Sequence, residues 1–198
     1  FTALLVLATA MSFTPGPNTT LSTALAANHG LKRALPFVCS VPIGFGALLC
    51  VCALGLGALL LALPLLGWVV KLVGVAYLLW LAWKLVQATG LASANAAQMN
   101  VGFWQGASLQ FMNIKGWMLA LAIMGGWIAG REHPGARFAI VLPVLLVFTF
   151  ASTLSYALMG SLLRDWLAGP AQTGMRLRWF NRAMAAVLML TAGWMLTV

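Results

Sequence analysis

The chain has 198 residues, of which 63% are hydrophobic and 7% charged, and its mean hydropathy is +0.99. A soluble domain carries roughly 25% charged residues, so this composition excludes a water-exposed surface and predicts an integral membrane protein. Eleven Lys and Arg against two acids give a net charge of +9. The basic residues lie at the ends of apolar runs and form no aromatic-interleaved patch, which argues against nucleic-acid binding.

Six segments are long and apolar enough to cross a bilayer, which takes about 20 residues of helix. We expect one transmembrane domain, 1–198, in two halves, about 1–88 and about 103–198. A polar, alanine-rich linker at about 89–102 divides them. The predicted fold is therefore an all-α membrane protein with six spanning helices. The expected spans are 2–27, 35–63, 66–86, 103–129, 138–163 and 179–198.

The first span is interrupted in its middle by the sequence FTPGPNTT, residues 13–20. Pro15 and Pro17 each remove a backbone donor, and Gly16 adds flexibility where a helix needs none. An unsatisfied backbone group in hydrocarbon costs several kcal/mol, so irregular backbone at membrane depth is tolerated only beside protein or water. We interpret this break, together with Asn18, as part of a substrate-binding site. The alternative is a kink that only improves packing.

The second and third spans carry features that packing explains. Small residues recur in GFGALL and GLGALL, where they let helices approach closely in lipid and also permit a homodimer. Cys39, Cys50 and Cys52 fall in one apolar run without a His cluster or a second cysteine pair. We therefore expect buried thiols, no metal site and no cofactor.

The fourth span repeats the pattern of the first. Its sequence FMNIKGW, residues 111–117, places Asn113, Lys115 and Gly116 inside an apolar run. Like FTPGPNT, it begins with Phe and lies in the first helix of a three-helix half. Because an odd number of spans inverts the second half against the first, we predict two inverted three-helix repeats. In such architectures paired interruptions indicate the transport site.

Lys115 is the basic residue that lies deepest inside a span. It follows Phe103 by 12 residues, or roughly 18 Å of helix at about 1.5 Å per residue, which is close to mid-bilayer. An ionisable group at that depth costs at least ~2.5–3.5 kcal/mol, and such residues are functional by default. We favour a role in substrate binding. The alternative is a side chain that snorkels to the interface.

The basic residues beside the six spans indicate how the chain is oriented in the membrane. Seven basic residues flank the odd-numbered loops and three flank the even-numbered ones, so we place the odd loops in the cytoplasm and both termini outside. The chain begins at Phe1 without Met or a basic leader, so we expect a late start or a trimmed N-terminus and no cleavable signal peptide. The seven basic residues that flank the odd-numbered loops are Lys32, Arg33, Lys84, Arg164, Arg176, Arg178 and Arg182. The three that flank the even-numbered loops are Lys71, Arg131 and Arg137.

Four motifs in order resemble the LysE/RhtB family of bacterial amino-acid exporters, also called LysE-type translocators. The most specific is TPGPN in the first span. KLVGVAYLLWLAWKL, around Gly74 and Tyr77, is similar to the family's third helix. FWQGASLQFMNIK resembles its fourth helix and WFNRAMAAVLMLTAGWML its last. The resemblance covers nearly the whole chain.

This resemblance implies a six-helix carrier of the bacterial inner membrane that exports amino acids or related small metabolites, driven by the proton gradient. Two departures bear on substrate range and coupling. The family's fourth helix usually reads Asn-Pro-Lys, whereas Ile114 stands here in place of the proline, so we expect a gentler break. Its second helix often carries an acid after a glycine, whereas Gly44 is followed here by Phe45.

The expected mechanism is alternating access around the two breaks. The unwound segment at Pro15, Gly16, Pro17 and Asn18 exposes helix ends to a central cavity, where the N-terminal end of a half-helix favours a carboxylate. Asn18 and Asn113 supply hydrogen bonds, and Lys115 supplies positive charge for the same carboxylate.

Charge limits both the substrate and the coupling. The two acids, Glu132 and Asp165, lie in or beside loops, so no carboxylate is available at mid-membrane. A neutral zwitterion therefore fits this site better than a cationic amino acid. The proton carrier is left open between Lys115 and Asp165.

Two other classes of protein compete with a carrier. A membrane enzyme needs a nucleophile with a base, a metal set or an acid pair in the spans. The intramembrane serines have no His or Asp partners, so we expect no enzyme. A passive channel or a structural subunit is the stronger alternative. A channel would not saturate, and a structural subunit would copurify with a partner.

Overall fold

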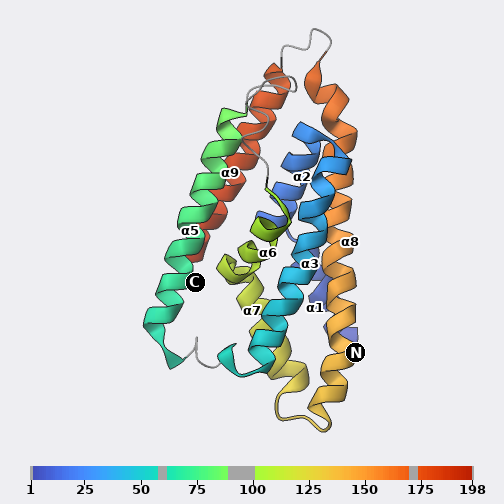
Figure 1. Ribbon diagram of the computed structural model, residues 1–198, viewed down its shortest axis with the longest axis vertical. Coiled ribbons are helices and arrows are strands. Elements are labelled where there is room, and N and C mark those ends of the chain that lie inside the picture. Colours follow the sequence, from blue (N-terminus) through green and yellow to red (C-terminus); the bar gives the residue numbers. More distant parts are fainter. Residues whose placement is uncertain (1, 58–61, 89–100, 170–173, 198) are drawn as a thin grey trace.

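The computed structural model describes residues 2–57, 62–88, 101–169 and 174–197, and these residues form helices and short connections without a strand (Figure 1). Most of the predicted linker, 89–100, lies outside the described residues. The helices are α1 (Thr2–Phe13), α2 (Pro17–His29), α3 (Leu31–Ala53), α5 (Pro64–Gln87), α6 (Phe103–Met112), α7 (Ile114–Ile123), the π-helical turn η2 (Met124–Ile128), α8 (Pro134–Ala168) and α9 (Met175–Thr197).

Three of these helices, α3, α5 and α8, are long and apolar enough to cross a membrane. The consecutive helices Phe103–Met112 and Ile114–Ile128 pass the same test as a pair, which makes a fourth span with a bend of 68°. By length and composition the described residues therefore supply three to four spans. The chain is an all-helical, multi-pass membrane protein, as its composition predicted.

The second helix ends earlier than the sequence predicted. We expected a span to residue 63, whereas α3 ends at Ala53. Gly55 follows with a φ of +91°, in the left-handed region that glycine adopts at little cost. A backbone turn of this kind does not change hydropathy, so the apolar run continued past the end of the helix.

The predicted break in the first span is present between α1 and α2. Gly16 is extended, with φ −171°, and Pro17 begins α2 at a position where the missing N–H costs nothing. The Gly16 N–H donates to Thr19 Oγ1 at 2.9 Å, and the Thr19 hydroxyl donates back to Gly16 O at 3.0 Å. A local side chain thus satisfies the backbone that the break exposes.

The predicted break in the fourth span is also present, and it needs no proline. Asn113 alone separates α6 from α7, with extended φ and ψ of −94° and 101°. Its Oδ1 accepts the Lys115 backbone N–H at 3.2 Å and so caps α7. The 68° bend shows that Ile114 did not prevent a sharp break. The asparagine cap accounts for it.

Two hydrophobic cores lie on either side of the breaks. One joins α2, α3, α5 and α9, and the other joins α1, α3, α7 and α8. Glycines allow the closest approaches, as the small-residue pattern predicted. A Cβ at Gly160 of α8 would lie 2.2 Å from Thr23 O of α2, and one at Gly44 of α3 would lie 2.6 Å from Ala107 O of α6. These backbone contacts fix α2 and α6 beside the long helices.

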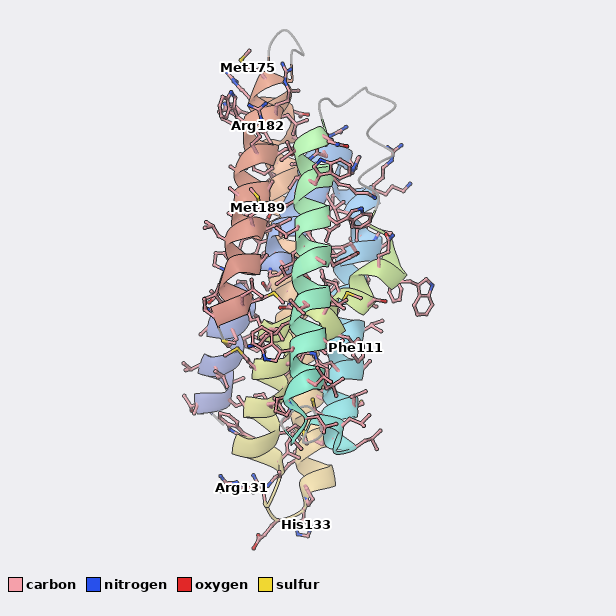
Figure 2. All side chains as sticks on the ribbon, turned by 90° about the vertical axis from the view of Figure 1, so that its left-hand side faces the viewer. Phe111, Arg131, His133, Met175, Arg182 and Met189 are labelled. Carbon is pink, nitrogen blue, oxygen red and sulfur yellow. The ribbon has the colours of Figure 1, made fainter. Side chains whose placement is uncertain are left out.

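Figure 2 shows the two ends of the molecule and the level of the breaks. Arg131 and His133 lie at one end, and Met175 and Arg182 lie at the other. Phe111, beside the fourth-span break, lies roughly half-way between them. In Figure 1, α2 lies in the half of the molecule that contains the α2–α3 connection, with α6 beside it toward the middle, while α1 and α7 point to the opposite end.

Candidate functional site

The two helix breaks lie against each other and are joined by side-chain hydrogen bonds. The Lys115 ammonium, at the start of α7, donates to Thr14 O at the end of α1, with a distance of 3.0 Å. Asn18 and Gln110 form a reciprocal amide pair, in which each Nδ2 or Nε2 donates to the other's oxygen at 2.9 and 3.0 Å. Residues almost a hundred positions apart therefore form one polar site.

The end of α1 is stabilised by donors from other helices. A helix leaves its last carbonyls without intrahelical partners. Here the Ser152 hydroxyl donates to Ser12 O at 2.7 Å, and the Tyr156 hydroxyl donates to Phe13 O at 2.9 Å. With Lys115 on Thr14 O, three consecutive carbonyls have partners, and the positive charge of Lys115 faces the negative end of the α1 dipole.

The end of α6 has a similar cap. The Trp117 indole N–H donates to Phe111 O at 2.8 Å, across the break, and the Trp117 side chain is buried. Gln110 uses a second donor to Gly106 O at 3.0 Å. Both breaks therefore hold their exposed backbone in place with side chains, which keeps the site ordered without a continuous helix.

Two cavities adjoin the breaks. The smaller, about 60 Å³, has room for a few waters and is lined by polar and apolar side chains from α1, α2, α3, α6, α7 and α8. The larger, about 450 Å³, is mostly apolar and reaches Leu190 and Trp194 of α9. Thr14, Gly16 and Lys115 line both cavities, so the polar site borders an apolar pocket whose wall includes the exposed side chains of Leu190 and Trp194.

Comparisons with known proteins identify the family. Residues 9–197 match the family described as "LysE type translocator". The chain is a member of this family.

Individual relatives of this translocator are cysteine/O-acetylserine efflux proteins. One from Salmonella typhimurium is 31% identical over 155 residues, which are 77% of this chain and 78% of the relative. One from Klebsiella pneumoniae is 30% identical over 161 residues, with the same coverage of 77% and 78%. One from Escherichia coli O1:K1 is 34% identical over 110 residues, 52% of this chain and 53% of the relative. No solved structure matches.

Membership confirms several predictions made from the sequence. The protein is a membrane transporter of an amino-acid efflux family and not an enzyme. Within the described residues no group of three or more His, Cys, Asp or Glu could hold a metal ion.

The translocator's predicted site residues lie in one place. Gly16, Pro17, Asn18, Asn113 and Lys115 all line the small cavity. Pro15 is exposed and lines only the larger apolar one. Their predicted role in substrate binding stays a prediction, because the structure carries no substrate.

Sequence reasoning missed several residues of this site. Gln110, only 1% exposed, pairs with Asn18, and its polar side chain in the run LQFMNIK was a signal that could have found it. Ser152 and Tyr156 cap α1 from α8. Tyr156 is the one tyrosine of α8, but nothing in the sequence separates Ser152 from the other serines of the helix, Ser155 and Ser161.

The charge of the site comes from one lysine. Among the described residues that line the two cavities, Lys115 is the ionisable group, and neither Glu132 nor Asp165 is present. Phe45, which follows Gly44 where the family often has an acid, forms part of the wall of the small cavity. This wall is therefore apolar.

Proposed function

We propose that this translocator is a secondary-active exporter that carries neutral amino acids such as cysteine or O-acetylserine out of a bacterial cell across the inner membrane. The observation that carries the proposal is the junction of two broken helices around a small polar cavity. Cysteine/O-acetylserine efflux proteins are relatives over three-quarters of the chain, which supports this substrate class. The export is driven by the proton gradient.

The proposed transmembrane fold has six spans in two inverted halves, about 1–88 and about 103–198. The broken α1–α2 unit and α9 add two spans to the four candidates. Helix contacts support the inversion. If α1, α2, α3 and α5 correspond to α6, α7, α8 and α9, the contact of α2 with α8 matches that of α7 with α3. The contact of α1 with α8 then matches that of α6 with α3. The contacts α3–α8 and α5–α9 map onto themselves.

The two halves differ in how tightly matched helices pack, which supports alternating access. The α2–α8 and α3–α6 contacts are far more extensive than their counterparts, α3–α7 and α1–α8. In the proposed cycle, the end that contains α2 and α6 is the closed end. Basic residues place that end in the cytoplasm, with both termini on the other side. Transport exchanges the two packing arrangements between the halves.

At the proposed binding site, the substrate carboxylate lies near Lys115, and Asn18 and Asn113 supply hydrogen bonds. The breaks at Pro15–Pro17 and at Asn113 expose helix ends, and the N-terminal ends of α2 and α7 favour the carboxylate. A zwitterion suits a site whose one ionisable lining group is a lysine, because the substrate brings no net charge that a carboxylate would have to balance.

The test is an intracellular accumulation assay in cells that overproduce the protein, across a panel of amino acids. Selective depletion of cysteine or O-acetylserine is the expected result. In proteoliposomes an imposed pH gradient should drive saturable uptake, whereas downhill flux without saturation would indicate a channel. Copurification with a partner and no flux would indicate a structural subunit.

Two variants test the site itself. Lys115→Met and Asn113→Ala should each lower transport of the depleted amino acid, because they remove a charge and a cap at the breaks. Lys71→Met is the control, since Lys71 lies over Trp68 of α5 and lines neither cavity. Unchanged transport in both site variants would show that this site assignment is wrong.

A further inference from the structure

The carbonyl end of α1 is a cation-binding feature that the proposed function does not yet use. Ser12, Phe13 and Thr14 present three consecutive carbonyl oxygens, each with a side-chain donor from α7 or α8. Such a helix end carries a partial negative charge. It is therefore suited to hold an ammonium group.

The three carbonyls differ in what occupies them. Two accept neutral hydroxyls of α8, one of them from Ser152, which is only 1% exposed. The third, Thr14 O, accepts the ammonium of Lys115. Thr14 and Lys115 line both cavities. Ser12 and Ser152 line the small cavity only, so the ammonium–carbonyl contact is the one of the three whose two partners line both cavities.

An amino acid carries an ammonium and a carboxylate on the same carbon. We propose that the Lys115 ammonium occupies the subsite of the substrate's own ammonium, and that the substrate inserts between Lys115 and Thr14 O. The substrate ammonium then binds Thr14 O, and Lys115 turns to the substrate carboxylate. This inference rests on the proposed function and assigns the two charges of the substrate within the same site.

The exchange leaves the net charge of the site unchanged and keeps an ammonium group on Thr14 O. Before binding, one ammonium lies on the α1 carbonyl; after binding, another does, and Lys115 has gained a carboxylate partner. Neither ammonium lacks an acceptor at either stage, which avoids the cost of an unpaired charged group.

Ligands with only one of the two charges cannot complete the exchange. A primary amine must displace Lys115 from Thr14 O and gives it no new partner. A carboxylate alone can pair with Lys115 but draws it from the carbonyl, which then lacks a donor. Both half-ligands should bind more weakly than the whole amino acid.

The experiment compares cysteine with its two half-molecules on the purified full chain, under reducing conditions. Cysteamine lacks the carboxylate, and 3-mercaptopropionate lacks the ammonium. Binding is read from the rise of the melting midpoint with ligand concentration, which needs no transport activity. Wild type, Lys115→Met, Lys115→Arg and the control Lys71→Met are measured together. Melting without ligand shows that each variant is folded.

The Lys115→Met variant has no side-chain ammonium to compete with cysteamine for Thr14 O. Cysteamine should therefore bind about tenfold tighter than in wild type, as expected for one hydrogen bond to a charged group. Binding of 3-mercaptopropionate should be lost in the same variant. Lys115→Arg and Lys71→Met should keep the wild-type order, with cysteine tighter than either half-molecule. Opposite changes for the two half-molecules are the signature of the exchange.

Cysteamine binding that is unchanged or weaker in Lys115→Met would overturn the inference, because Lys115 would then not occupy the ammonium subsite. If wild type binds cysteine and this pattern is absent, the inference fails and the exporter stands. If wild type binds neither cysteine nor O-acetylserine, the proposed substrate class is wrong, and the inference that rests on it is wrong as well. Should Lys115→Met not fold, Lys115→Gln carries the same expectation.

Discussion

A buried amide cluster lies at the C-terminal end of α2, and its hydrogen bonds can be tested by substitution. Asn28 of α2 and Asn181 of α9 are 5% and 0% exposed. Each amide donates to the other's oxygen, at 2.8 and 3.0 Å. Asn181 also donates to Ala88 O at 2.9 Å, and Asn28 to Ala24 O at 2.8 Å. The cluster therefore joins α2, α9 and the end of α5.

The perturbation is Asn181→Leu, which keeps the branched shape of the side chain and removes three hydrogen bonds. It leaves a buried Asn28 amide and the Ala88 carbonyl without these partners. Each unsatisfied buried group costs about 1–3 kcal/mol, so we expect the two groups to cost about 2–6 kcal/mol together. Because Asn28→Leu breaks the same pair, the double variant should cost less than the sum of the single ones by about 1–2 kcal/mol.

The measurement is the melting midpoint of the purified protein from tryptophan fluorescence, combined as a double-mutant cycle. Thr197→Val of α9 is the control, because its exposed hydroxyl bonds only to Trp194 O in the same helix. An Asn181→Leu midpoint equal to that of wild type would refute the cluster. So would strictly additive losses, since they would mean that the two amides do not interact.

Two further predictions concern packing and pH. Gly160→Ala should destabilise the protein by about 1–3 kcal/mol, because its Cβ would lie 2.2 Å from a backbone carbonyl of α2. Gly193→Ala, with no atom within 4 Å of the added Cβ, should be neutral or stabilising in the same melting assay. Burial, with Arg33 and Arg164 nearby, lowers the pKa of His29 below its usual range. The unfolded chain therefore binds more protons, so stability should fall as the pH drops from about 7.5 to about 5.5, and His29→Gln should flatten this slope.

The breaks could be predicted from sequence because their chemistry is local. Pro15, Gly16 and Pro17 cannot continue a helix, and Asn113 and Lys115 are conspicuous in an apolar run. The end of α3 could not be placed, because Gly55 turns the chain without changing its hydropathy.

The partners across the site could not be predicted, because they depend on how each helix is rotated about its axis. Helix α8 has serines and threonines along much of its length, yet Ser152 reaches α1 while Ser155 bonds back to Ala151 O within α8. From the sequence, both were simply intramembrane serines without a His or Asp partner. The difference arises from packing, which the glycine contacts of α8 and α2 determine.

Lys115 connects the two helix breaks of the fold and is also the charged group of the proposed binding site. A charge inside a span must be compensated, and here the compensation comes from the carbonyl end of a broken helix rather than from a carboxylate. Breaking α1 creates the acceptor, and breaking the fourth span brings the donor to it. Each interruption therefore stabilises what the other exposes. In the proposed exchange, a substrate that carries both charges replaces this contact without leaving either partner unsatisfied, which is the reason for proposing that the two breaks form a binding site.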